Sequence, residues 1–74
     1  MKITTYLLTN LQTQEQETFT DLDLAIDSLA SKPEIHLKEK IRPMLELIGM
    51  DAVGKVFSVK GKYSLAVVNI TNVE

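Results

Sequence analysis

The residues from 62 to 71 constrain the fold of this chain more than any other segment. They are predicted to form a β-strand whose two alternating sets of residues are both apolar. These sets are Tyr63, Leu65 and Val67 on one side, and Ala66, Val68 and Ile70 on the other. A strand that is apolar on both sides belongs in the middle of a sheet or beneath another covering surface. We therefore expect this strand to lie centrally in a sheet, beside the first strand of the chain.

Three further segments are expected to complete the sheet. Residues 2–9 are rich in β-branched and apolar residues, which is typical of a strand. After a turn at residues 10–13, residues 14–18 are almost wholly polar, so that Glu15 and Glu17 fit an edge strand that discourages further pairing. Residues 53–59 are predicted to pair with the last strand through a turn at Lys60 and Gly61.

A well-marked helix is predicted between the two hairpins. Thr20 is the expected N-cap, with Asp23 at the position of a capping-box acid, and Phe19 and Leu24 are expected to form a hydrophobic staple. The helix should end near Ser31, because the following Pro33 disfavours helical geometry at the residue before it. Its core-facing stripe is predicted to consist of Leu22, Ala25, Ile26 and Leu29.

A second helix is expected to follow at once. Ser31 and Glu34 form the pattern of a capping box, with Pro33 in the tolerant first turn, and Gly49 is a typical C-terminal stop. Pro43 opposes one continuous helix, because it removes a hydrogen bond and its ring clashes with a preceding carbonyl, so we expect a kink or a break there. The apolar face is predicted to contain Leu37, Ile41, Met44, Leu45 and Ile48.

These elements predict a single α+β domain over residues 1–74, in ββααββ order. A four-stranded antiparallel sheet would carry two helices on one face, the second kinked or broken at Pro43. A chain of 74 residues buries only about 60% of its unfolded surface. Because it has no cysteine, disulfides cannot reinforce it. Helix packing, and a partner subunit, are the remaining sources of stability.

Composition also bears on where the protein acts. The longest uncharged apolar run covers residues 63–70, whereas a membrane span needs about 20 residues. The first residues do not form a secretory signal, because a lysine is followed by threonines and no small-residue cleavage site is present. We therefore expect a cytoplasmic protein with no membrane partner, and the absence of cysteine is compatible with this compartment.

The start of the chain resembles a group of known proteins. A short hairpin is followed by the pattern Phe19-x-x-Leu22-x-x-Ala25-Ile26-x-x-Leu29. This arrangement, which covers about residues 3–31, resembles the opening of many small uncharacterised α+β proteins from bacteria and their phages or prophages. The resemblance implies an origin as a small accessory protein. It implies no activity and no site residues.

The sequence offers few residues for catalysis or cofactor binding. Residues 49–56 approach the phosphate-binding pattern G-x-x-x-x-G-K-[ST], but Val56 replaces the hydroxyl that would hold Mg²⁺, and the order of helix and strand is inverted. His36 is the sole histidine and lacks evident catalytic partners. The aspartates at 21, 23 and 27 are explained by capping and by the helix dipole. We expect no cofactor, no metal and no enzymatic activity.

The leading hypothesis is a non-enzymatic protein-interaction module that binds another protein or itself, as a homodimer. Helices cover only one face of a sheet, so the other face of the last strand is the expected partner surface. The interface is predicted to include Tyr63, Leu65 and Val67, or else the opposite set Ala66, Val68 and Ile70.

A small nucleic-acid-binding regulator is the alternative hypothesis. Its phosphate contacts would come from the cations of the second half of the chain, which are Lys38, Lys40, Arg42, Lys55, Lys60 and Lys62. Against it, the isoelectric point is near 5.3, the helical cations alternate with glutamates, and aromatic residues are few.

Overall fold

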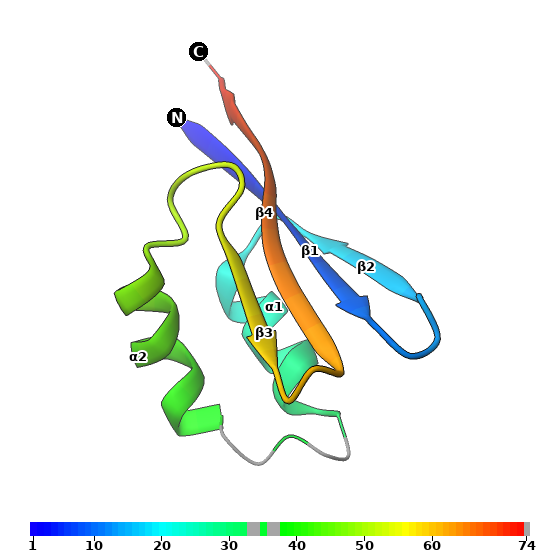
Figure 1. The fold of residues 1–74 in the computed structure, drawn as a ribbon. Helices are drawn as coiled ribbons and strands as arrows, with labels where there is room; N and C mark the ends of the chain where they lie inside the picture. Colours follow the sequence, from blue (N-terminus) through cyan, green and yellow to red (C-terminus); the bar gives the residue numbers. More distant parts are fainter. Residues whose placement is uncertain (33–34, 36–37, 74) are drawn as a thin grey trace.

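The computed structural model describes residues 1–32, 35 and 38–73 and shows an α+β fold in ββααββ order (Figure 1). The strands are β1 (Lys2–Asn10), β2 (Gln16–Phe19), β3 (Val56–Val59) and β4 (Tyr63–Asn72). The helices are α1 (Leu22–Ala30) and α2 (Lys38–Ile48). The fold class predicted from the sequence is confirmed.

The four strands form one antiparallel sheet in the order β2-β1-β4-β3. The last strand therefore lies centrally beside the first, as its two apolar sides predicted, and the polar strand β2 lies at an edge. The turn between β3 and β4 is formed at Lys60 and Gly61, whose φ angles are 53° and 66°. Two successive residues with positive φ are typical of a type I′ turn, which matches the twist of paired strands.

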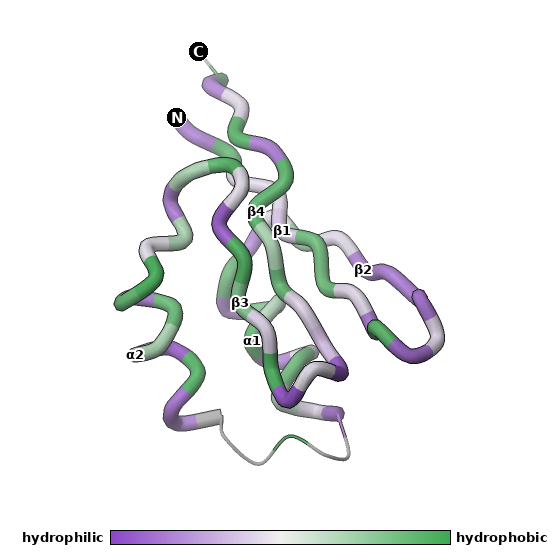
Figure 2. Tube along the Cα trace, in the orientation of Figure 1, coloured by the Kyte–Doolittle hydropathy of each residue, from purple (hydrophilic) through white to green (hydrophobic). Residues whose placement is uncertain are grey.

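The hydrophobic core lies between one face of the sheet and the two helices. In Figure 1 the sheet lies in front of α1, and Figure 2 shows hydrophobic residues along β4, β3 and the helices, whereas the β1–β2 connection is largely hydrophilic. The core residues that point from the sheet toward the helices are Tyr6, Leu8, Phe57, Val59, Tyr63, Leu65 and Val67. Those that the helices supply are Ala25, Ile26, Leu29, Ile41 and Leu45.

The start of α1 differs from the prediction by one residue. The N-cap is Asp21, not Thr20, and its Oδ1 accepts a hydrogen bond of 2.8 Å from the backbone N–H of Asp23. Moving the cap by one position also removes the expected staple, since Leu24 points outward and is 57% exposed. Aspartate and threonine are both good caps, so local preference alone does not choose between neighbouring positions. The helix ends at its C-cap Ser31, as predicted.

The helix α2 is continuous from Lys38 to Ile48 although it contains Pro43, so the predicted break is absent. Pro43 and Glu39, the residue four positions earlier, are both exposed. Water can therefore satisfy the carbonyl that proline leaves unbonded, which explains how the helix tolerates the residue. Gly49 ends the helix with a φ of 77° and an N–H that bonds the Leu45 carbonyl at 2.9 Å. The predicted capping box rests on Glu34, which lies outside the described residues, as do Pro33 and Leu37.

A β-bulge divides the central strand pair into two parts. The register shifts between Thr5 and Tyr6, where Thr5 is opposite Asn69 and Tyr6 is opposite Val67, so that Val68 is the extra residue. Beyond the bulge, residues 2–5 of β1 and 69–72 of β4 pair with each other only, and we call this part the terminal ribbon. In Figure 1 the ribbon projects from the body of the molecule, with both termini at its end.

Leu65→Ala tests the core that the structure describes. Leu65 is fully buried at 0% exposure, so truncation should lower the free energy of unfolding by about 2–5 kcal/mol through lost burial and a residual cavity. Leu47→Ala is the matched control, because Leu47 is 89% exposed and should change stability by less than about 0.5 kcal/mol. Urea unfolding measures both variants. Equal effects of the two substitutions would contradict this core.

Candidate interaction surface

The structure places the first predicted interface set inside the core. Tyr63, Leu65 and Val67 face the helices and are 8%, 0% and 1% exposed. A partner could reach them only if the helices moved away from the sheet. The prediction that this set forms the interface gains no support from this placement, because these side chains are buried within the chain itself.

The opposite set is divided by the bulge. Ala66 lies on the face of the sheet that carries no helix, and Val68, at the bulge, is 43% exposed. The extra residue shifts the alternation of β4 by one position, so Ile70 lies on the helix side with Val67. There Ile70 packs against the edge of the core. Two of the three residues in this set are thus accessible to a partner.

The face of the sheet without helices, which we call the open face, carries no charged side chain. The register places its residues in one layer across all four strands. From β1 and β2 these are Ile3, Thr5, Leu7, Thr9, Gln16 and Thr18, and from β3 and β4 they are Val56, Ser58, Ser64, Ala66, Val68, Asn69 and Thr71.

The predicted basic residues are spread over different elements. Lys38, Lys40 and Arg42 belong to α2. Lys55 precedes β3, whereas Lys60 and Lys62 lie beyond its other end, about 17 Å away along an extended strand. Arg42 forms an exposed ion pair with Asp23 of α1, which offsets its charge. Nucleic-acid binding through these residues stays a prediction.

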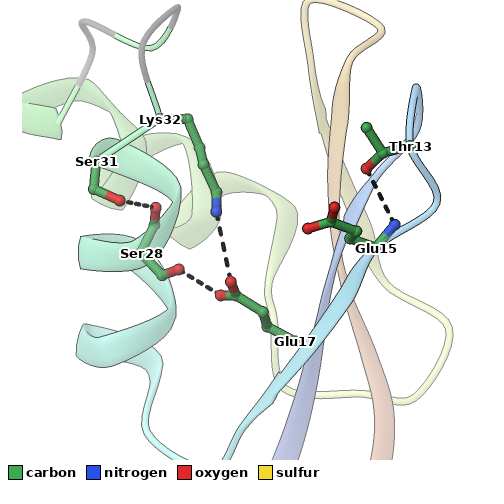
Figure 3. Close-up of polar contacts among 6 residues, drawn as sticks. All are labelled: Thr13, Glu15, Glu17, Ser28, Ser31 and Lys32. Atoms are coloured by element: carbon green, nitrogen blue, oxygen red, sulfur yellow. Dashed lines mark hydrogen bonds and ion pairs between the residues drawn. The ribbon is translucent and has the colours of Figure 1, made fainter.

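A polar cluster ties the edge strand β2 to α1 (Figure 3). Glu17 points toward the helices, and its Oε2 accepts a hydrogen bond of 2.7 Å from the Ser28 hydroxyl. Its Oε1 lies 3.6 Å from the Lys32 Nζ. The backbone N–H of nearby Glu15 donates a hydrogen bond of 3.3 Å to the Thr13 hydroxyl oxygen, and the Glu15 side chain lies on the same side of the sheet as Glu17. These contacts explain why a strand with little apolar surface stays in place.

An apolar cleft of about 260 Å³ lies where α1 begins and α2 ends. Leu22, Leu45 and Met50 form its apolar walls, and Arg42 and Glu46 stand at its rim. The Arg42–Asp23 ion pair joins the two helices beside it. The cleft holds apolar surface next to charges of both signs.

The other residues considered for ligand or metal binding have structural roles wherever the structure describes them. Within residues 49–56, Gly49 ends α2, and the N–H of Gly54 bonds the Val67 carbonyl at 3.0 Å, so the segment follows a helix and leads into a strand. Asp21 caps α1 and Asp23 pairs with Arg42. In the part of the chain that the structure describes, no group of three or more His, Asp or Glu side chains is placed to hold a metal. His36 lies outside the described residues.

Comparisons with protein families, with curated proteins and with solved structures find no match to this chain. Among the described residues, neither helix is long and apolar enough to cross a membrane. The open face is a continuous surface across all four strands, and neither helix covers it.

Glu17→Gln tests the contact between β2 and α1. Removing the charge weakens the ion pair with Lys32 and the charge-assisted bond from Ser28, so the free energy of unfolding should fall by about 0.5–1 kcal/mol at low salt. Glu15→Gln removes a like charge two residues earlier in the chain without breaking these contacts. It should change the free energy of unfolding by less than about 0.3 kcal/mol. Thermal unfolding of both variants provides the comparison. A loss as large in Glu15→Gln would show that the cluster has no specific role.

Proposed function

We propose that the protein is a non-enzymatic protein-interaction module that associates with a second copy of itself through the uncharged surface of its sheet. This surface consists of the open face and the adjoining outer edge of β4, the side away from β1, over residues 68–73. One observation supports the proposal: across four strands the open face carries no charged residue, although 24% of the chain is charged.

An uncharged surface is suited to self-association for an electrostatic reason. A two-fold contact places the same patch of both copies together, so any charge near the axis faces its own like charge. The acidic and basic residues of the described chain instead lie on the helices, on the turns and at the ends and inner side of the strands. The sheet can therefore meet its own copy without electrostatic repulsion at the contact.

Sedimentation velocity tests this function. We expect the sedimentation coefficient to rise between about 10 µM and about 1 mM protein, the range in which weak contacts populate a dimer. The rise should persist when the Debye length is shortened from about 30 Å to about 3 Å by raising the salt concentration, because apolar contacts and backbone hydrogen bonds carry no net charge. A monomer at every concentration would contradict the proposal.

The nucleic-acid hypothesis gains no specific support from the geometry, and the same experiment separates it from self-association. Binding through lysines and arginines releases counterions and weakens steeply as salt rises. Addition of a DNA or RNA oligonucleotide at low salt would then produce a faster-sedimenting complex that is lost at high salt. Self-association predicts no such complex.

A further inference from the structure

The outer edge of β4 has free backbone groups beyond the bulge. Met1 and Val73 exchange two backbone hydrogen bonds, of 2.9 Å and 2.7 Å, which fixes the phase of the ladder in the terminal ribbon. Because hydrogen-bonded and non-hydrogen-bonded pairs alternate in an antiparallel ladder, Thr71 points its backbone groups toward β1. Ile70 and Asn72 then point their N–H and C=O groups outward.

The neighbouring segment covers this edge only as far as Val67. The N–H of Val67 donates to the Lys55 carbonyl at 2.9 Å, and the Val67 carbonyl accepts from Gly54 at 3.0 Å. At Gly54 the φ angle is 97°, and the chain turns away from β4. No hydrogen bond among the described residues satisfies the outward groups of Ile70 and Asn72. The edge is therefore open from residue 68 onward.

Exposed apolar side chains lie along this open edge. Val68 lies in β4 and is 43% exposed, and Val73 directly follows the strand and is 40% exposed. Val53, at 60% exposure, directly precedes Gly54, where the chain leaves β4. A strand added here would both satisfy backbone groups and cover apolar surface, whereas Leu7 and Ala66 on the open face are already half-buried and have less to gain.

The other edge of the terminal ribbon is protected by charge. The outward residues of β1 are Lys2 and Thr4, so an added strand would pass beside a lysine. Edge lysines are a common device against unwanted pairing. Residues 67–72 of β4 and the following Val73 include no charge, proline or glycine. Of the two edges, that of β4 is the one left without such protection.

We infer that a second copy of this chain pairs with the outer edge of β4 in an antiparallel contact centred on Thr71. This inference rests on the proposed self-association and specifies its geometry. Ile70 of one copy lies opposite Asn72 of the other, and these pairs exchange four backbone hydrogen bonds. The two Thr71 residues meet in a non-hydrogen-bonded pair, and the two sheets become continuous. The contact involves few residues and buries less surface than the roughly 1,000 Å² of a stable interface. The dimer is therefore weak and forms at high protein concentration.

Single cysteines test this geometry, because the chain contains none of its own. In a non-hydrogen-bonded pair the Cα atoms lie about 4.5 Å apart, within the range of a disulfide. Thr71→Cys should therefore give a disulfide-linked dimer under mild oxidation. Asn69→Cys is the matched control from the same face of the same strand, because its two copies would lie about 14 Å apart. We expect crosslinking of Thr71→Cys to be at least about tenfold faster.

A backbone variant then separates edge pairing from contact through the open face. In the Thr71→Cys background, Asn72→Pro removes an outward N–H but no bond to β1, so the monomer should unfold at an unchanged temperature while crosslinking falls severalfold. Asn72→Ala keeps the N–H and should crosslink normally. Two results would overturn the edge geometry in a parent protein that still dimerises. These are equally fast crosslinking of Asn69→Cys and Thr71→Cys, or no effect of Asn72→Pro on crosslinking. In either case the proposed self-association would stand. If the parent protein stays monomeric, both are overturned.

Discussion

The antiparallel pairing of β1 with β4 is the interaction on which the rest of the fold depends. The chain builds two local hairpins, β1–β2 and β3–β4, and this pairing alone joins them into one sheet. It joins residues at the two ends of the chain, from Lys2 opposite Asn72 to Asn10 opposite Tyr63. Such a contact has a large loop-closure cost, which the buried residues of both strands must offset. Both helices pack against the continuous surface that this pairing creates.

The bulge at Val68 divides the β1–β4 pair into two parts with different surroundings. Before it, Tyr63, Leu65 and Val67 face the helices and fill the core. After it, the ribbon continues beyond the edge strands, so that its outer backbone groups meet no hydrogen-bond partner among the described residues. One extra residue therefore separates the part of β4 that stabilises the monomer from the part that remains available to a partner.

Patterns spanning many residues predicted the fold class, the central position of the last strand and the polar edge strand. Choices between neighbouring residues were not predictable in the same way. Asp21 and Thr20 are both good caps, and in the structure Asp21 takes this role. Pro43 was expected to kink or break α2, and its exposed position permits the helix to continue without a break. The choice between the two alternative interface sets stayed open in the sequence, because alternation shows that both sides of the strand are apolar and does not show which side the helices cover. The bulge has no local signal such as glycine.

The edge of β4 beyond the bulge is open in the monomer, and we propose that it becomes paired between two copies. Amide hydrogen exchange followed by NMR at low and high protein concentration tests it most directly, because it reports each backbone group separately. The N–H groups of Ile70 and Asn72 should exchange rapidly in dilute solution and slow markedly in concentrated solution, while Thr71, bonded to β1, is protected in both. If the exchange of Ile70 and Asn72 does not depend on concentration, the account is wrong.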